Sequence, residues 1–218
     1  MTRRLAWIVL VALLARGGSS FADPPATLLS GTPATGAALD PAFAHLTFDR
    51  LRCKFTEAKH VALLARPLTS AGTIYFDRAK GVARVTTAPK PQSVVVSKTT
   101  IRIKSGTTVE TIPLDKNKDL KAFALVFPSL LRGDRAELDK AFSIALYGND
   151  ADWWALTFAP KSPSLEHLVS RVIVIGHKSE PVTLKIVEAS GDTTETQLTD
   201  LAKNGDVSDA EITAAFGN

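Results

Sequence analysis

Short stretches of alternating apolar and polar residues dominate the chain from about residue 50 onward, and they predict a protein built mostly from β-strands. Ile74 and Phe76 lie two positions apart and fall on one face of a strand, as do Ile101 and Ile103. Gly, Pro, Lys and Ser residues separate these runs and are typical of turns. The first strands are predicted over 51–66, 72–78, 82–87, 93–97 and 100–104.

The pattern changes to helical spacing at Asp115. Apolar residues recur every three or four positions over 118–131, which indicates one face of a helix; they are Leu120, Phe123, Ala124, Phe127, Leu130 and Leu131. Pro128 interrupts this stripe, and Gly133 ends it. Asp134 can cap a second short helix over 135–142.

Alternation then returns and predicts further strands over 142–146, 154–158, 171–176, 182–186 and 193–198. Asp40 followed by Pro41 predicts the start of a short helix before the first strand. Ser208 and Glu211 form a capping box that opens a last helix. The sum is a single α+β domain, a large antiparallel sheet with a helical insertion at its middle.

The N-terminus has the layout of a secretory signal peptide. A short basic region, Met1–Arg4, precedes an apolar run of 11 residues, Leu5–Ala15, and small residues stand before a cleavage point at Asp23. The run is about half the length that a membrane-spanning helix needs. We therefore predict a signal peptide over 1–22, a flexible lead-in over 23–39 rich in Pro, Gly, Thr and Ala, and a periplasmic location for the mature domain, 40–218.

Composition narrows the classes of function. The chain has 45% hydrophobic and 22% charged residues, as an ordinary globular protein does, and a net charge of +4. Three arginines and no acid lie in residues 1–22, so the remainder carries only +1. This balance disfavours nucleic acid as a partner. Cys53 is the only cysteine, which excludes an internal disulfide and a cysteine-rich zinc site.

The sequence lacks the common motifs of hydrolase, metalloprotease and nucleotide-binding sites. It contains no GxSxG, HExxH, GxxxxGK[ST] or GxGxxG pattern. The four histidines are scattered singly, so no metal site is expected. Asn149, Asp150 and Asp152 lack the spacing of a calcium loop and are interpreted as a hairpin turn. The sequence therefore predicts that the protein is not an enzyme and uses no cofactor.

Apolar residues are the prominent feature. Ten Phe and three Trp are spread over the predicted strands and helices, and many of them must form the core. The interrupted stripe over 118–131 has the character of a lid above the concave face of an incomplete barrel. A lid closed against an apolar groove is one way for a soluble protein to hold acyl chains.

Several segments, in their order and spacing, resemble the LolA family of periplasmic lipoprotein carriers, and in particular a LolA-related branch. The similarity covers roughly residues 40–200; the segments that carry it are 54–59, 67–78, 88–89, 127–142, 154–161, 171–176 and 191–195. The resemblance implies an eleven-stranded antiparallel β-barrel that is not closed, a half-barrel, with helices covering its concave face. It also implies that Arg78 is the latch that hydrogen-bonds the helical lid and holds it shut, although Ala79 stands where the family usually has proline.

Alternation and the lid stripe together give a set of candidate groove residues that would contact acyl chains. They are Ile74, Phe76, Val94, Val96, Ile101, Ile103, Phe123, Phe127, Leu130, Leu131, Trp154, Leu156, Phe158, Ile173, Ile175, Leu184 and Ile186. The assignment at 171–176 is a choice between two apolar faces.

The resemblance implies a monomeric carrier that shuttles lipoproteins from the inner to the outer membrane. Its expected partners are the acyl chains of lipoproteins or other lipids, an inner-membrane export complex and an outer-membrane acceptor. Two alternatives stay open at this point. One is a carrier for another lipid or lipid-like molecule in an export pathway, and the other is a lipoprotein-binding sensor or assembly factor.

Overall fold

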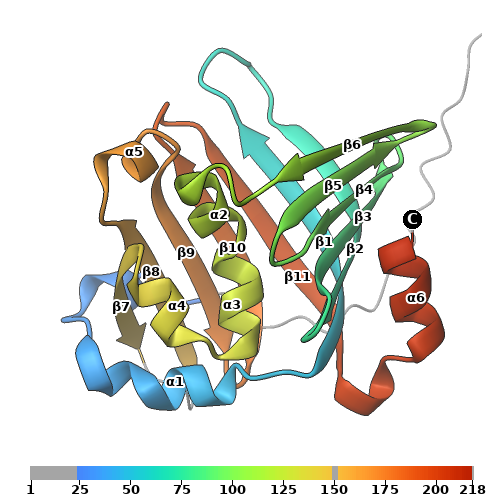
Figure 1. Ribbon diagram of the computed structural model, residues 1–218. Coiled ribbons are helices and arrows are strands. Elements are labelled where there is room, and N and C mark those ends of the chain that lie inside the picture. Colours follow the sequence, from blue (N-terminus) through green and yellow to red (C-terminus); the bar gives the residue numbers. More distant parts are fainter. Residues whose placement is uncertain (1–23, 149–151, 218) are drawn as a thin grey trace, which may run out of the picture.

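One antiparallel sheet forms the framework of the computed structural model, which describes residues 24–148 and 152–217 (Figure 1). Its strands are β1 (Arg50–His60), β2 (Leu68–Asp77), β3 (Gly81–Ala88), β4 (Gln92–Val96), β5 (Thr100–Ser105), β6 (Thr108–Pro113), β7 (Phe142–Gly148), β8 (Trp153–Pro160), β9 (Val169–His177), β10 (Glu180–Glu188) and β11 (Thr193–Lys203). The order across the 11-stranded sheet is β6-β5-β4-β3-β2-β1-β11-β10-β9-β8-β7. Within the described ranges the edge strands β6 and β7 do not pair, so the predicted unclosed barrel is confirmed.

The pairing of β1 with β11 joins two meanders, β1–β6 and β7–β11, into the one sheet. Because β6 and β7 are opposite edges, the chain between them must cross the open side of the half-barrel. That crossing contains α2 (Lys118–Ala124), α3 (Val126–Arg132) and α4 (Arg135–Asp139). Figure 1 shows these helices in front of the concave face of β7–β11, with β4–β6 curving forward on the other side.

The predicted helical stripe over 118–131 consists of two helices that meet at Leu125. Pro128 is the third residue of α3 and has no N–H to donate to the carbonyl of Ala124, so a continuous helix is interrupted one turn before the proline. Gly133 ends α3 with φ of 70°, and a Cβ there would lie 2.4 Å from Thr47 Oγ1. The second helix, α4, is shorter than the predicted 135–142, since Phe142 already belongs to β7.

The main core lies between the concave face of the sheet and the helices. Apolar side chains at alternate positions of β1, β2, β7, β8 and β9 pack there against α1 (Asp40–His45), α3, α4 and α5 (Pro163–Glu166). Phe76, Leu130, Leu131, Leu156 and Phe158 are fully buried in this core. We call α2, α3 and α4 the helical cover. This apolar core fixes the cover to one half of the sheet.

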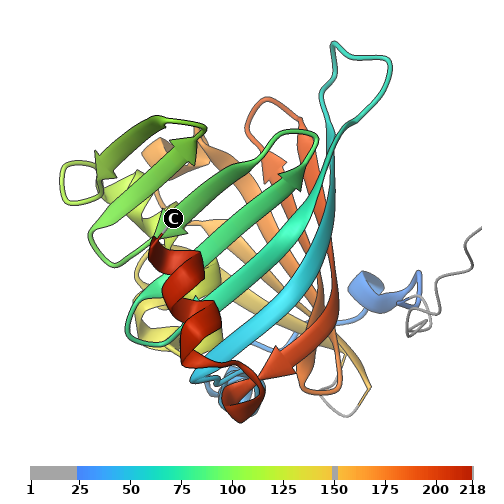
Figure 2. The same cartoon turned by 90° about the vertical axis from the view of Figure 1, so that its right-hand side faces the viewer.

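The C-terminal helix α6 (Asp209–Gly217) packs on the opposite, outer face of the sheet, against β2 and β3 (Figure 2). It follows the 3-10 turn η3 (Asn204–Asp206) and covers a second, small apolar cluster in which Ala215 meets Ala83 and Val95. The predicted capping box is present. The N–H of Glu211 donates to Ser208 Oγ at 3.3 Å, and Glu211 Oε2 accepts from the N–H of Ser208 at 3.0 Å.

Part of the predicted flexible lead-in, residues 24–39, contacts the domain in the structure. They contain the 3-10 turns η1 (Leu28–Ser30) and η2 (Gly36–Leu39), and Ala34 forms a β-bridge with Leu146 of β7. Leu39 is 1% exposed. The Pro- and Gly-rich composition suggested a linker, but these two apolar side chains attach the segment to the core. The predicted signal peptide, 1–22, and most of the predicted hairpin turn at 149–152 lie outside the described residues.

The first predicted strand, 51–66, is too long at its C-terminal end. Strand β1 ends at His60, and 61–67 form the connection to β2, which projects beyond the sheet (Figure 2). Leu63 and Leu64 there are 94% and 48% exposed. Their apolar character extended the predicted strand, although no neighbouring strand pairs with them in the described structure.

Candidate functional site

An apolar strip on the concave face of β4–β6 is the candidate binding surface. Cross-strand register places Phe76, Val82, Val96, Ile101 and Ile112 in one row across β2–β6. Val94 and Ile103 share this face one row further along. We define the apolar strip as Val94, Val96, Ile101, Ile103 and Ile112, all of which are half-buried.

Burial differs sharply between the two ends of this face. Ile74 and Phe76 of β2 are 5% and 0% exposed, because the core continues over them. The strip on β4–β6 lies beyond this cover, and its apolar side chains retain contact with solvent. A row of partly exposed apolar side chains on the inner face of an open sheet is suited to an apolar ligand.

The helical cover contributes apolar surface of the same kind. Phe123 of α2 and Phe127 of α3 are half-buried and pack at the margin of the core, as do Leu184 and Ile186 of β10. In contrast, the core beneath the helices is filled by Leu130 and Leu131 of α3. Partly accessible apolar side chains are therefore present on the helices and on β10 as well as on the strip.

The predicted groove residues of β8 belong to the filled core. Trp154, Leu156 and Phe158 are 2%, 0% and 0% exposed. The indole N–H of Trp154 donates to the carbonyl of Lys178 at 2.6 Å, which fixes the ring. These residues support the helical cover and offer no accessible surface in this conformation.

Arg78 joins the sheet to the end of the helical cover. Its Nη1 donates to the carbonyl of Arg132, the last residue of α3, at 3.3 Å, and its Nε contacts Asp49 Oδ1 at 2.9 Å. Carbonyls in the last turn of a helix have no partner within the helix, so a guanidinium can satisfy one of them. Burial lowers the pKa of the Arg132 guanidinium, and the nearby charge of Arg78 lowers it further.

A model of protein families describes residues 38–217 as an outer membrane lipoprotein carrier protein LolA-like domain. The chain belongs to the LolA-like family. The family consists of carrier and binding proteins rather than enzymes. No curated protein sequence matches the chain significantly.

Solved structures similar to this LolA-like protein include a LolA superfamily protein from Nitrosomonas europaea, with 11% identity, a TM-score of 0.42, and coverage of 81% of this chain and 96% of that chain. LprF from Mycobacterium bovis has 12% identity, a TM-score of 0.37, and coverage of 82% and 99%. The MucA/MucB complex of Pseudomonas aeruginosa has 13% identity, a TM-score of 0.45, and coverage of 81% and 60%.

The prediction that Ile173 and Ile175 line the groove of this LolA-like protein is wrong. Register pairs Leu156 with Val174 and Phe158 with Val172, so the valines face the core. The two isoleucines pair with Thr157 and Ala155 on the outer face. Both faces of β9 are apolar in sequence, and alternation alone does not distinguish them.

Several residues of the concave face were not among the candidates. They are Leu51, Cys53 and Phe55 of β1, Val82 of β3, Ile112 of β6, and Val172 and Val174 of β9. Ile112 is the one that extends the apolar strip. Its strand was not predicted, because the sequence of β6, TVETIP, has only two strongly apolar residues; pairing with Ile101 reveals its face.

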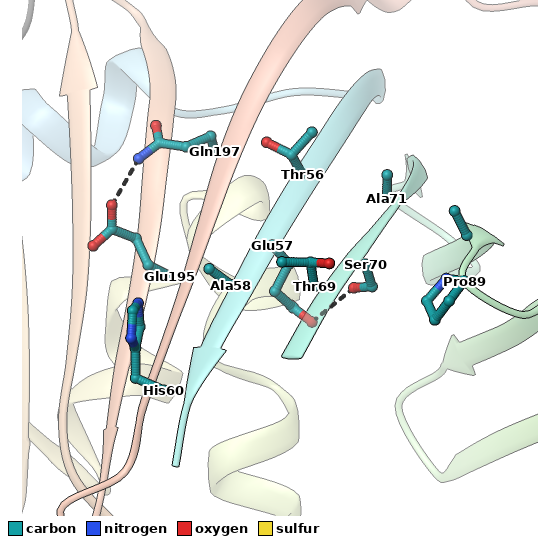
Figure 3. A pocket seen from close by; sticks show the side chains of 11 residues that line it. Thr56, Glu57, Ala58, His60, Thr69, Ser70, Ala71, Pro89, Glu195 and Gln197 are labelled. Carbon is teal, nitrogen blue, oxygen red and sulfur yellow. Dashed lines mark hydrogen bonds between the residues drawn. The ribbon is translucent and has the colours of Figure 1, made fainter. Parts of the chain in front are cut away.

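Two further cavities lie away from the strip. One, of about 460 Å³, opens on the outer face of β1, β2 and β11; its lining combines polar side chains such as Thr56, Glu195 and Gln197 with the apolar Ala58, Ala71 and Pro89 (Figure 3). The other, of about 510 Å³, lies between α2, α4, α5 and β7. Its floor includes Leu138, Phe142 and Leu165, and lysines surround it. Neither contains the predicted groove residues of β2–β5.

The described ranges contain neither a candidate metal site nor a candidate membrane-spanning helix. Residues 24–148 and 152–217 contain no group of three or more His, Cys, Asp or Glu side chains arranged to hold a metal ion. No helix in the same ranges has the length and apolar character that crossing a membrane requires.

Proposed function

We propose that this LolA-like protein is a periplasmic carrier that holds acyl chains on the apolar strip and shuttles lipoproteins from the inner to the outer membrane. The observation that carries the proposal is the half-buried strip on the concave face, together with the half-buried Phe123 and Phe127 of the helical cover. The predicted signal peptide supports the location. An inner-membrane export complex, an outer-membrane acceptor and a monomeric state belong to the same proposal.

The energetics of acyl chains explain why a carrier needs such a surface. Each methylene removed from water contributes about 0.8 kcal/mol, so several long chains amount to tens of kcal/mol. A useful carrier must bind the chains almost as favourably as a bilayer does, and no more favourably. Weaker binding would prevent loading from the donor membrane, and tighter binding would prevent delivery to the acceptor.

We propose that the helical cover adjusts this balance, with Arg78 as its latch. The bond from Arg78 to the Arg132 carbonyl supports this role, since it joins β2 to the end of α3. Ligand and cover compete for the same apolar residues, so acyl chains favour an opened arrangement of the cover. The half-buried groove residues on β4, β5, β10, α2 and α3 remain predicted ligand contacts in the present arrangement. The buried ones would become ligand contacts only when the cover opens; they are Ile74, Phe76, Leu130, Leu131, Trp154, Leu156 and Phe158.

Native mass spectrometry of the protein purified from its own periplasm tests the cargo. A co-purified lipoprotein supports the proposal, a co-purified free lipid favours the carrier for another lipid, and neither favours a sensor or assembly factor.

A pair of substitutions on β6 tests the site. Ile112→Asp places a charge on the concave strip, and Val109→Asp is its control, since Val109 is 55% exposed on the outer face of the same strand. We expect the first to reduce binding of a triacylated lipopeptide at least about tenfold and the second to leave it unchanged. Equal effects of the two substitutions would contradict the proposed site.

A further inference from the structure

A small polar cluster interrupts the concave face at the margin of the apolar strip. Glu57 of β1 accepts hydrogen bonds at Oε1 from Arg84 Nη2 at 2.8 Å and from Ser70 Oγ at 3.1 Å. Its Oε2 accepts from Thr196 Oγ1 at 3.0 Å. Figure 3 shows Glu57 and Ser70 meeting between β1 and β2. The four side chains come from four strands, β1, β2, β3 and β11.

Arg84 is flanked by apolar residues in a row that ends with Glu110 on the edge strand β6. Its neighbours on the concave face are Ile74 of β2 and Val94 of β4, and Ile103 continues the row on β5. The side chain of Arg84 is 27% exposed and that of Glu57 is 22% exposed. Placing charges among apolar side chains costs free energy, and the ion pair recovers only part of it. Packing alone therefore does not explain why a charged residue occupies position 84.

The guanidinium of Arg84 is held in a defined place. It lies over the ring of Phe55, 4.3 Å from the centroid, which favours a cation on the ring face. Phe55 in turn lies over Gly72, where a Cβ would come within 2.9 Å of the ring atom Cε1 and 2.1 Å of the Val85 carbonyl oxygen. The missing side chain at Gly72 leaves room for the ring and for the arginine above it.

The cluster retains unused hydrogen-bond donors. Arg84 Nη2 donates to Glu57 and to Ser70 Oγ, while its Nε and Nη1 have no acceptor among the residues that the structure describes. Thr86, the next residue of β3 on the same face, has a buried hydroxyl without a hydrogen-bond partner. A group with several acceptor oxygens could take these donors.

We infer that Arg84 binds the anionic head group, a carboxylate or a phosphate, of an amphiphile whose acyl chain lies along the apolar strip. The inference rests on the apolar strip of the proposed function and concerns its alternative cargo, a free lipid, because the acyl chains of a lipoprotein are attached through uncharged ester and amide bonds. The chain would contact Val94 and Ile103, which flank Arg84 in its row. Glu57 positions the guanidinium and competes with the head group for it.

Fluorescence titration of delipidated protein with cis-parinaric acid and with its methyl ester tests the inference. The two probes share one chain and differ only in the charge of the head. We expect the wild type to bind the acid about tenfold more tightly than the ester, since a hydrogen bond between charged groups is stronger than one to a neutral ester. Arg84→Met should remove this preference and change ester binding less than about twofold.

Glu57→Gln is the matched variant with the opposite expectation. It removes the competing charge and should tighten binding of the acid, whereas a purely structural role predicts that both variants weaken both probes alike. Equal binding of acid and ester by the wild type, or an unchanged preference in Arg84→Met, would overturn the inference alone. Failure of both probes to bind the folded wild type would overturn the proposed function as well.

Inorganic phosphate and acetate, without a chain, identify the source of the anion. At millimolar concentration they should not displace cis-parinaric acid, because the apolar strip contributes most of the affinity. Displacement by either small anion would show a site for free anions and overturn the head-group assignment.

Discussion

Glu211 shows at the scale of single residues how the outer helix is attached. Its carboxylate accepts from the N–H and the hydroxyl of Ser208, and it pairs with Arg52 of β1 at 2.5 Å. These hydrogen bonds lower the pKa of Glu211 to about 2. One side chain therefore completes the capping box of α6 with Ser208 and links the helix to the sheet.

The depressed pKa of Glu211 predicts acid sensitivity of α6. The carboxylate is protonated more readily in the unfolded chain, so its stabilising contribution is complete above about pH 4.5 and is lost as the pH falls toward about 2. Hydrogen exchange of the α6 amides should accelerate across this interval. Glu211→Gln should exchange faster at neutral pH and show a weaker acid dependence; the same acid dependence as the wild type would contradict this assignment.

Cys53 is a natural reporter of the concave face. It is 0% exposed in the core, and burial raises its pKa to about 12. The thiolate is the reactive form and is scarce at pH 8. We expect iodoacetamide to modify the native protein far more slowly than the protein in urea, measured by mass spectrometry. Comparable rates in the two states would show that the thiol is accessible.

At the scale of elements, the helical cover is fixed to the sheet by the α3 core residues at its centre and by Arg78 at its end. The core contact is large and apolar, whereas the latch is a hydrogen bond from a partly exposed guanidinium. Partly exposed pairs contribute about 1 kcal/mol or less. Loss of the latch should therefore loosen the cover without unfolding the domain.

Arg78→Leu tests this difference. We expect faster alkylation of Cys53, altered lipid transfer, and a fall in Tm of less than about 10 °C. Lys98→Leu, in the exposed turn between β4 and β5, is the control and should leave the alkylation rate unchanged. A Tm fall above about 10 °C together with unaltered transfer would assign Arg78 a purely structural role.

The sequence predicts most elements because alternation and caps are local signals. The Asp134 cap and the Ser208 capping box are confirmed. The start of α1 is correct to one residue, but Leu39 and not Asp40 occupies its N-cap position. The predictions fail where the length or orientation of a strand depends on pairing with its neighbours. The leucines at 61–67 lack a pairing strand, and β9 is apolar on both faces, so the orientation of Ile173 and Ile175 depends on register with β8.

At the scale of the whole molecule, the topology itself keeps one side open. The β1–β11 pairing joins the two meanders, and the chain must then pass from edge β6 to edge β7 across the concave face. The helices of this passage cover β7–β11 and leave the strip on β4–β6 half-buried (Figure 1). An accessible apolar surface follows from strand order rather than from any one residue.

The candidate site could be predicted only in part for the same reason. Alternation identifies Val94, Val96, Ile101 and Ile103 as one face, but cross-strand register is needed to add Ile112 and to place Arg84 among them. A single arginine in a strand normally indicates a solvent-facing position. Only the pairing of Arg84 with Ile74 and Val94 shows that it lies on the concave face.

The most direct test of the carrier account is an NMR titration of isoleucine methyl groups with a triacylated lipopeptide, compared with the same peptide without acyl chains. The account predicts that the acylated peptide alone shifts the methyl signals of Ile101, Ile103 and Ile112. Ile173 and Ile175 on the outer face should not respond. Unchanged signals from the strip, or shifts confined to the outer face, would contradict it.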